Sequence, residues 1–287
     1  MKLSINQLRA LEAVVRTGSF SAAAKELGIS QPSVSNHLLA LEKHYCTQLI
    51  HRNGRLAEPT ELCSEVLSRI RSVLAMTREV EQILEGRKQL QTGTIRLGYS
   101  TYQFALPIIS KFMEQYPDVN IEARAMASHD LMPLLQDGNF DVAFISAKSP
   151  PPEVNAFEMR IEQMVAVVGK EHPLAQFEML QWKQLADLPL IQREKSSETR
   201  RVFEANAIKA GISLKTVLAL GSWGSIVTSV QSGMGVGIAM AGEVTELDNL
   251  VAIPIDDNEL TVSHFLICLP EMQHIASIQA IFDIASQ

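Results

Sequence analysis

The sequence lacks the long apolar runs of membrane-spanning and exported proteins. Residues 1–6 do not contain the unbroken apolar core of a secretion signal. The most apolar stretch, residues 226–241, is interrupted by three glycines, which argues against a transmembrane helix. Cysteine is scarce too: Cys46, Cys63 and Cys268 are an odd number of thiols without metal-site spacing. We therefore expect a cytoplasmic protein with reduced cysteines.

Motifs of the common enzyme classes are missing as well. There is no phosphate-binding loop, and the glycines of residues 233–237 lack the spacing of a dinucleotide-binding fingerprint. Neither a Gly-x-Ser-x-Gly nucleophile elbow nor a zinc-type cluster of histidines and cysteines occurs. We therefore expect no enzyme, and hence no catalytic residue, metal or cofactor. A free-standing solute-binding protein is a third class, but it would need a secretion signal and would not need residues 1–60.

What is present is an ordinary globular composition with an uneven charge distribution. Of the 287 residues, 46% are apolar and 20% are charged, which suits two or three compact units without a long disordered region. Residues 1–90 contain 12 Lys and Arg against 9 Asp and Glu, whereas residues 91–287 contain 13 against 23. A slightly basic head on an acidic body fits a DNA-facing domain, although an excess of three charges alone is weak evidence.

Helix signals at the start of the chain predict three short helices, over residues 5–17, 20–27 and 31–45. Ser19 and Ser30 stand at the N-cap positions of the second and third helices, and Gly28 supplies the left-handed turn between them. The alanines of residues 22–24 are small enough for two helices to cross closely. This pattern is typical of a helix-turn-helix, whose last helix enters the major groove of DNA.

The third helix begins with short polar side chains that can contact base edges and phosphates. A three-helix cap with an ordinary polar surface would give a similar pattern, so this alternative remains open. Arg52 and Arg55 follow in the next segment, within reach of phosphate or the minor groove. The predicted DNA-binding residues are Ser19, Ser21, Ser30, Gln31, Pro32, Ser33, Ser35, Asn36, His37, Arg52 and Arg55.

Residues 49–60 predict a β-hairpin, because two short strands flank the turn signal Asn53-Gly54. Residues 61–89 then predict one long helix. Its apolar positions alternate steps of four and three residues, the repeat of a coiled-coil seam. The seam residues are Val66, Ile70, Val73, Thr77, Val80 and Leu84, of which Thr77 is the polar exception. A solvated helix of this length is marginal alone, so we expect a partner helix.

After Gly93 the pattern alternates between strands and helices. The expected strands cover residues 95–99, 119–125, 142–146, 164–169, 188–192, 217–220, 236–240, 250–255 and 263–269. The expected helices cover residues 106–116, 131–136, 198–210, 225–231 and 273–285. Such alternation predicts a mostly parallel sheet covered by helices and, at this length, split into two lobes.

Several of these segments resemble one known family. Residues 20–35, which read Phe-Ser-Ala-Ala-Ala-Lys-Glu-Leu-Gly-Ile-Ser-Gln-Pro-Ser-Val-Ser, look like the DNA-binding signature of LysR-type transcriptional regulators, as do residues 41–43. Residues 93–99, 135–145 and 233–238 are similar to the effector domain of that family. The resemblance therefore covers essentially the whole chain.

The resemblance implies three parts: an N-terminal all-α winged helix-turn-helix at 1–60, a linker and dimerisation helix at 61–90, and an effector-binding domain at 91–287. The last is an α/β two-lobed domain like a periplasmic binding protein, with lobe I over about 91–161 and 267–287 and lobe II over about 162–266. The implied partners are double-stranded promoter DNA, a small-molecule effector and further copies of the chain. A homodimer would form through residues 62–84, and a homotetramer in many members. RNA polymerase is a further candidate partner.

An effector site follows from the expected sheet. In a doubly wound sheet the ligand binds beyond the C-terminal ends of the strands, where helix N-termini present free N–H groups. Ser100 and Thr101 also match the effector loop of the family. Ser128 and Ser197 have the alternative role of N-caps, whereas Trp223 stands between glycines, an unusual place for a core residue. The candidates are Ser100, Thr101, Tyr102, Ser128, His129, Arg193, Ser196, Thr199 and Trp223.

Hydroxyls with one or two arginines favour a small anion such as a carboxylate, phosphate or phosphonate. Residues 196–201 and 221–225 are loosely similar to LysR-type regulators associated with aminoethylphosphonate catabolism. The sequence departs from the family at Cys46 and Cys63, where members usually carry glycine. One alternative is therefore a redox-sensing regulator that uses these two thiols. A buried cysteine also serves as a small hydrophobe.

Overall fold

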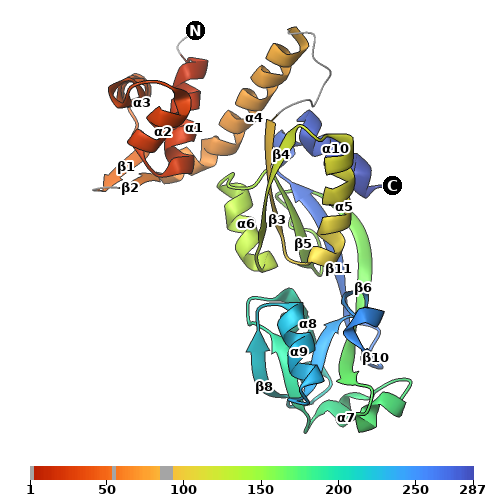
Figure 1. The fold of residues 1–287 in the computed structure, drawn as a ribbon. Coiled ribbons are helices and arrows are strands. Elements are labelled where there is room, and N and C mark those ends of the chain that lie inside the picture. Colours follow the sequence, from red (N-terminus) through yellow and green to blue (C-terminus); the bar gives the residue numbers. More distant parts are fainter. Residues whose placement is uncertain (1–2, 54–55, 85–92) are drawn as a thin grey trace.

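The computed structural model describes residues 3–53, 56–84 and 93–287, which form a small N-terminal domain, a long helix and a two-lobed domain (Figure 1). The α-helices are α1 (Ile5–Thr17), α2 (Phe20–Leu27), α3 (Gln31–Tyr45), α4 (Glu61–Leu84), α5 (Tyr102–Gln115), α6 (Ser128–Gln136), α7 (Trp182–Leu185), α8 (Glu198–Lys209), α9 (Trp223–Gln231) and α10 (Ala276–Ala285). Short 3-10 helices are η1 (Pro173–Gln176), η2 (Ala241–Glu243), η3 (Glu246–Asp248) and η4 (Pro270–Met272). The strands are β1 (Ile50–Asn53), β2 (Leu56–Pro59), β3 (Gly93–Tyr99), β4 (Val119–Ala125), β5 (Val142–Ala147), β6 (Asn155–Gly169), β7 (Pro189–Arg193), β8 (Lys215–Leu220), β9 (Val236–Met240), β10 (Leu250–Pro254) and β11 (Thr261–Cys268).

The N-terminal domain packs α1, α2 and α3 around a core of leucines, valines and alanines. Ser19 and Ser30 cap α2 and α3, each accepting a hydrogen bond from a backbone N–H of the first turn. Gly18 and Gly28 end α1 and α2 with φ of 64° and 66°, a region that glycine adopts without strain. The predicted helices and the turn between them are confirmed.

Strands β1 and β2 form the predicted antiparallel hairpin, with Ile50 opposite Pro59. Helix α4 follows, but its apolar seam has two different environments. Ile70 is buried in the core of the N-terminal domain, and Val66 packs against that core. Val73 and Val80 are exposed. The first part of the predicted seam therefore packs inside the N-terminal domain, and only the last part is exposed and could contact a partner helix.

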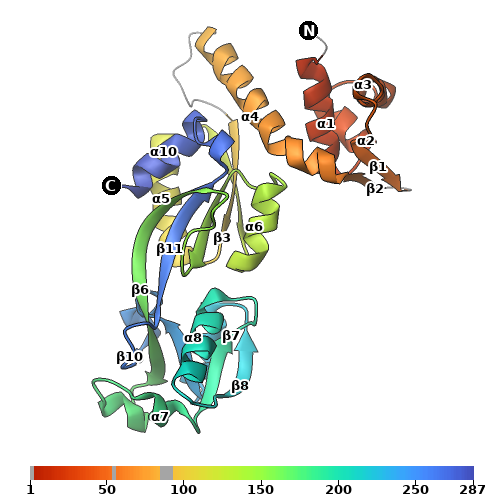
Figure 2. The same ribbon diagram turned by 180° about the vertical axis from the view of Figure 1, so that it is seen from behind.

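The two-lobed domain is organised on one sheet with the strand order β4-β3-β5-β11-β6-β9-β7-β8, and β10 pairs with β6. Lobe I has a core formed by β3, β5, β11 and helices α5, α6 and α10. Lobe II has two cores, one that includes α8 and one that includes α9. Figure 2 shows the lobes stacked end to end, with lobe I next to α4.

The sheet is mixed, which corrects the expectation of a mostly parallel one. Strand β3 pairs in parallel with β4 and β5, and β7 with β8 and β9. Strands β6 and β11, however, are antiparallel to each other and to their other neighbours. The sequence prediction missed residues 155–163 of β6, because most of these side chains are exposed or half-buried and form no apolar run.

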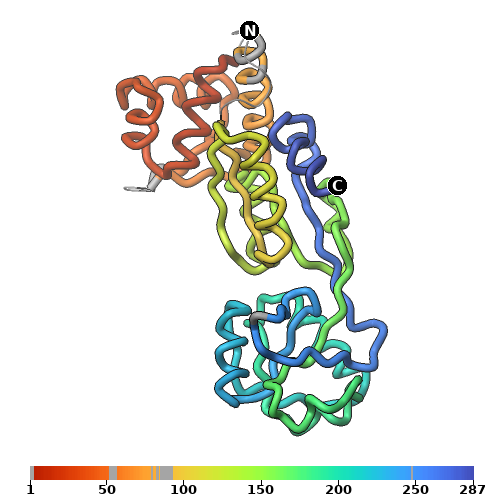
Figure 3. The backbone as a smooth tube through the Cα atoms, turned by 45° about the vertical axis from the view of Figure 1, so that its right-hand side comes forward, coloured from red at the N-terminus to blue at the C-terminus, as the bar shows by residue number. Residues whose placement is uncertain are grey.

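Strands β6 and β11 join the two lobes (Figure 3). On β6, Phe157 packs against the core of lobe I, whereas Met164 belongs to a core of lobe II. On β11, Val262 belongs to lobe II and Phe265 to lobe I. The β6–β11 ladder shifts register between His264 and Phe265, at the crossing itself. The lobes are therefore connected by two paired strands with an irregularity at the crossing point.

Within the described residues, no helix is both long and apolar enough to span a membrane. Nor do the described residues place three or more histidines, cysteines or carboxylates together where they could hold a metal ion.

Candidate functional site

The start of α3 forms a polar face on the N-terminal domain. Helix α1 lies between α3 and α4 in both ribbon views, so α3 is on the outer side of the domain (Figures 1 and 2). Gln31 and Asn36 are exposed there, while Val34 and Leu38 anchor the opposite side of the helix in the core. The Gln31 amide donates to the Ser35 hydroxyl at 3.3 Å. This face has the size and polarity of a helix that reads the major groove.

The remaining predicted DNA contacts lie around this face or outside the described chain. Ser21 is exposed at the start of α2, and Ser19 is half-buried because it caps that helix. Ser30 and Ser33 contact each other through their hydroxyls at 2.8 Å. The position of Arg55, like the side chain of Arg52, is outside the described residues.

A small pocket lies where the two lobes meet. It is lined by Ser100, Thr101, Ala127, Ser128 and Ser146 of lobe I and by Arg193, Ser197, Glu198 and Thr199 of lobe II. The volume open to the centre of a water molecule is about 10 Å³, which is room for about one water. Five of the candidates meet in this pocket: Ser100, Thr101, Ser128, Arg193 and Thr199. The lobes are closed on each other at this point.

Three helices begin at the pocket, and none of them has a side-chain cap. Thr101, Ala127 and Ser197 are the N-cap residues of α5, α6 and α8, and none accepts a capping hydrogen bond on its side chain. In contrast, Ser19 and Ser30 cap α2 and α3 in the usual way. Uncapped N-termini leave backbone N–H groups and the positive end of the helix dipole available to an anion.

The lobe I wall is a connected set of hydroxyls centred on Ser146. The Ser146 backbone N–H donates to the Ser128 hydroxyl at 2.8 Å. The Ser146 hydroxyl lies 3.2 Å from that of Ser100 and 3.4 Å from that of Thr101. On its other side it lies 3.0 Å from Nδ1 of His264. These contacts fix the positions of four pocket hydroxyls relative to one another.

The lobe II wall has free hydroxyls and a restrained arginine. Ser197 and Thr199 are 6% and 8% exposed, and among the described residues neither hydroxyl has a hydrogen-bond partner. Arg193 donates to the Gly221 carbonyl at 3.1 Å and lies 3.4 Å from Glu194 and 3.9 Å from Glu243. Its position is therefore fixed, and its charge is partly offset before any ligand arrives.

Four candidates are not part of the pocket lining. Trp223 is 3% exposed and belongs to a buried cluster with residues of β6, β7 and β9. This corrects the expectation that it lines the cleft: as the first residue of α9 its indole packs under the helix, against the sheet. His129 is exposed beside Asp130, and Tyr102 is exposed at the start of α5. Ser196 precedes α8 and is half-buried, and its neighbour Ser197 lines the pocket in its place.

Ser146, Ser197 and Glu198 line the pocket but are not in the predicted candidate set. Ser146 lies at the end of β5, so the rule that ligands bind beyond strand C-termini, applied to this strand too, would have found it. Capping of α8 is the alternative role of Ser197, but its hydroxyl makes no capping bond. Glu198 is ion-paired with Arg201 at 2.8 Å.

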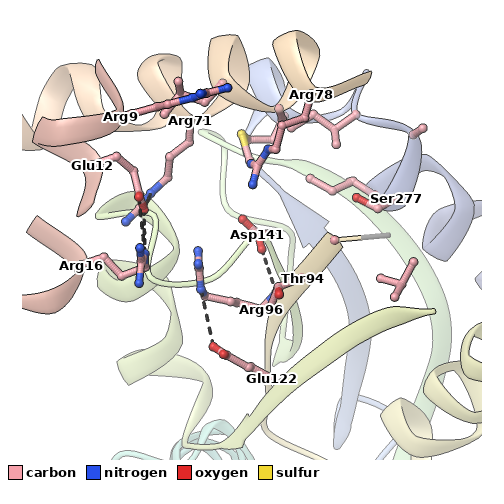
Figure 4. A pocket seen from close by; sticks show the side chains of 18 of the residues that line it. Arg9, Glu12, Arg16, Arg71, Arg78, Thr94, Arg96, Glu122, Asp141 and Ser277 are labelled. Atoms are coloured by element: carbon pink, nitrogen blue, oxygen red, sulfur yellow. Dashed lines mark hydrogen bonds and ion pairs between the residues drawn. The ribbon is translucent and has the colours of Figure 1, made fainter. Parts of the chain in front are cut away.

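A second, larger pocket of about 580 Å³ separates the N-terminal domain from lobe I (Figure 4). The buried Arg71 of α4 spans this junction, since it donates to the Asp137 carbonyl at 2.8 Å and lies 3.4 Å from Glu12 of α1. Four of the arginines in the lining are already ion-paired within the protein: Arg9, Arg16, Arg71 and Arg96. We therefore interpret this pocket as a polar joint between domains.

Both parts of the chain match models of known families. Residues 5–64 match the model described as "Bacterial regulatory helix-turn-helix protein, lysR family", and residues 88–287 match the "LysR substrate binding domain". The chain belongs to the LysR family. It is a DNA-binding transcriptional regulator with an effector-binding domain, and not an enzyme. This LysR-type regulator thus carries the helix-turn-helix and the two-lobed domain that the sequence predicts.

Individual relatives are similar over most of their length. A "Probable RuBisCO transcriptional regulator" of Cyanidium caldarium is 30% identical over 268 residues, which cover 89% of this chain and 84% of the relative. Full-length OxyR from Pseudomonas aeruginosa has the same fold with a TM-score of 0.81 at 16% identity, covering 99% of this chain and 94% of OxyR. The CcmR regulatory domain of Synechocystis PCC6803, in complex with 2-PG, has a TM-score of 0.61 at 22% identity, covering 68% of this chain and 96% of CcmR.

The two cysteines that distinguish this LysR-type regulator lie in different environments, since Cys63 is buried and Cys46 is exposed. Cys63 is fully buried in the core of the N-terminal domain, and burial raises the pKa of its thiol to about 11. A reactive sensor thiol needs the opposite shift. Cys46 ends α3 with φ of 51°, a left-handed conformation that favours glycine. The structure therefore does not favour the redox alternative.

Replacing Cys46 with glycine is expected to stabilise the N-terminal domain by about 0.5–1 kcal/mol. It relieves roughly 1–2 kcal/mol of strain in the left-handed residue, which exceeds the entropic cost of glycine of roughly 0.5–1 kcal/mol. Urea unfolding monitored by circular dichroism measures the change. Ser232→Gly is the matched control, since Ser232 ends α9 with φ of −79°. An equal gain in both variants would show that the backbone conformation at Cys46 is not the cause.

Proposed function

We propose that this LysR-type regulator responds to a small anion bound in the inter-lobe pocket, and that the anion changes its binding to promoter DNA. The observation that best supports this proposal is that three uncapped helix N-termini, those of α5, α6 and α8, converge on one pocket. An anion there would accept hydrogen bonds from backbone N–H groups and interact favourably with three helix dipoles.

The side chains of the pocket support the same class of ligand. Among the described residues the hydroxyls of Ser197 and Thr199 have no hydrogen-bond partner, and Arg193 brings a fixed positive charge that Glu194 and Glu243 partly offset. Glu198 in the lining is neutralised by Arg201. Carboxylate, phosphate and phosphonate are the anions that combine these requirements with small size. Because the CcmR domain binds 2-PG, this compound is a suitable one to test. Aminoethylphosphonate, to which the sequence resemblance points, is a second compound to test.

Binding must be accompanied by opening of the pocket. The lobes leave room for about one water at the centre, which is less than any of these anions needs. A ligand that binds the open arrangement more tightly than the closed one shifts the population toward it. The proposed signal is therefore a change in the angle between the lobes, which changes how the DNA-binding domains of an oligomer are spaced.

We also propose that two chains pair through α4, within residues 62–84. Leu84 and Val80 are 81% and 55% exposed, and Val73 and Met76 are exposed on the same helix. An exposed apolar stripe of this length is typical of a helix that packs against a second copy. Further pairing into a tetramer, and contact with RNA polymerase at the promoter, belong to the same proposal because the family consists of transcriptional regulators.

The test of the effector site is a fluorescence anisotropy titration of promoter DNA, taken upstream of the gene for this protein. Acetate, sulfate, inorganic phosphate, aminoethylphosphonate and 2-PG are added in turn. We expect at least one anion to change the affinity for DNA. Thr199→Val, which removes one pocket hydroxyl, should reduce the affinity for that anion about tenfold and leave DNA binding without anion unchanged.

Thr228→Val is the control, because Thr228 is exposed on α9 and its hydroxyl donates to the Gly224 carbonyl outside the pocket. If none of the anions changes DNA binding, the proposed ligand class is wrong. If Thr199→Val and Thr228→Val respond alike, the pocket is not the binding site.

Replacing Val80 with glutamate is expected to dissociate the dimer, since a charge would be buried in the apolar seam. Light scattering should then report about the 31.7 kDa of one chain, and the affinity for DNA should fall with it. Ile208→Glu is the control at an exposed apolar position on α8. An unchanged mass of the Val80 variant would contradict pairing through α4.

A further inference from the structure

A buried histidine lies directly behind the wall of hydroxyls in the inter-lobe pocket. His264 is 2% exposed and stands opposite Ser146 in the β5–β11 ladder, at the point where β11 crosses between the lobes. Its Nδ1 lies 3.0 Å from the Ser146 hydroxyl. Its ring packs against Phe104 of α5, with ring centroids 4.2 Å apart. His264 does not line the pocket, but it contacts the residue on which the lobe I hydroxyls converge.

The imidazole of His264 is neutral at physiological pH. Burial, together with the positive charge of Arg160 on β6, lowers the pKa of His264 to about 4. A neutral imidazole has one N–H donor and one bare nitrogen acceptor, so it can exist as either of two tautomers. Which nitrogen carries the proton decides whether His264 donates to Ser146 or accepts from it.

The surroundings of the second ring nitrogen decide between the tautomers. Nε2 of His264 is buried, and it has no hydrogen-bond partner among the described residues. A buried N–H without an acceptor is rarer in proteins than a buried acceptor without a donor. The arrangement with Nε2 bare and the proton on Nδ1 is therefore the favoured one. In that tautomer Nδ1–H donates to the Ser146 oxygen.

We propose that His264 is a positioning residue for effector binding: it holds a donor relay in which Nδ1–H donates to Ser146, Ser146 donates to Ser100, and Ser100 presents its own proton to the pocket. The distances of 3.0 Å from His264 to Ser146 and 3.2 Å from Ser146 to Ser100 allow this chain of bonds. The inference rests on the proposed effector pocket and adds the direction in which its hydroxyls point.

The relay matters for ligand class because each hydroxyl has a single proton. If His264 accepted from Ser146 instead, Ser146 would have no proton left for Ser100. Ser100 would then donate to Ser146 and present lone pairs to the pocket, which suits a cation or a donor. With the proton on Nδ1, Ser146 keeps its proton for Ser100, the nearer of its two hydroxyl neighbours at 3.2 Å against 3.4 Å for Thr101. Ser100 then presents a donor, which suits an anion. A histidine that never touches the ligand thus sets the polarity of this wall.

The tautomer can be measured without any ligand. Protein labelled with ¹⁵N on histidine gives distinct NMR signals for protonated and bare ring nitrogens, and the signals that disappear in His264→Asn identify His264. We expect a protonated Nδ1 and a bare Nε2 between pH 6 and 8. A protonated Nε2 with a bare Nδ1 would overturn the relay, whatever the ligand proves to be.

The functional test uses a pair of substitutions of equal size. His264→Asn retains an N–H donor close to the position of Nδ1, whereas His264→Leu has no donor. With 2-PG and inorganic phosphate as probes in isothermal titration calorimetry, we expect about tenfold weaker binding for His264→Leu and near wild-type binding for His264→Asn. His264→Leu combined with Ser146→Ala should bind no more weakly than either single variant, because both break the same chain.

Thermal unfolding of each variant separates positioning from loss of fold. Equal weakening in His264→Asn and His264→Leu would overturn the relay and leave a packing role. If Ser100→Ala weakens binding but His264→Leu does not, the pocket stands and the relay fails. If neither probe binds the wild-type protein, the proposed ligand class fails, while the NMR measurement still decides the direction of the hydroxyls.

Discussion

Replacing Gln31 and Asn36 together with alanine is expected to weaken specific promoter binding by at least about three orders of magnitude. Each side chain that reads a base contributes roughly 1–3 kcal/mol, and a dimer carries two copies of each. Both residues are exposed on α3, so their removal should not change the folded domain. Fluorescence anisotropy with the specific site and with an unrelated sequence measures the loss of affinity and of specificity.

Gln279→Ala is the control for this pair, since Gln279 is an exposed glutamine on α10, far along the chain from the helix-turn-helix. It should leave both affinities unchanged. The double variant should approach the weak, salt-dependent binding that phosphate contacts alone support. Retained specificity in the double variant would mean that α3 is not the helix that reads the bases.

Replacing Gly138 with alanine is expected to cost about 3 kcal/mol of stability, in two parts. The first is about 1 kcal/mol for a left-handed residue, because Gly138 has φ of +64°. The second comes from Arg71: the new Cβ would lie 1.7 Å from its Nη1. An arginine tip usually moves away at little cost, but Arg71 is 5% exposed and donates to the Asp137 carbonyl. Its displacement breaks a buried charged hydrogen bond worth about 1.5–3 kcal/mol.

Gly211→Ala is the control that carries only the first part of this cost, so the difference between the two variants gives the second part. Gly211 has φ of +71°, and nothing lies within 4 Å of the position of its Cβ. This variant should therefore lose the backbone contribution of about 1 kcal/mol alone. Urea unfolding of both variants gives the difference. Equal losses would show that Arg71 moves freely and that the junction of α1, α4 and α6 does not depend on it.

The N-terminal domain could be predicted closely because its signals are local. Ser19, Gly28 and Ser30 act within one turn of their own helices, and each is where the sequence placed it. The same applies to the hairpin of β1 and β2. Arrangements that depend on distant segments were harder: strands β6 and β11 turn antiparallel because they cross between lobes, which no local pattern records.

Candidate residues of the pocket could be predicted where the rule that ligands bind beyond strand C-termini and at helix N-termini applies. Ser100, Ser128 and Thr199 follow strands or begin helices, and the structure brings them together. Trp223 was misassigned because its glycine neighbours suggested exposure, whereas the start of α9 lies over the sheet and buries the indole. The role of His264 could not be predicted, since its partner Ser146 is 118 residues away and only strand pairing brings them together.

The pairing of β6 with β11 also limits how the lobes can move. A single connecting strand could twist and bend in any direction. Two hydrogen-bonded strands form a ribbon, from Thr261 opposite Gln163 to Cys268 opposite Asn155. A ribbon bends readily out of its plane but resists bending within it, where one edge would have to stretch. Movement of the lobes that bends this ribbon within its plane is therefore expected to be disfavoured, so ligands of different shape would favour the same direction of opening and differ in its extent.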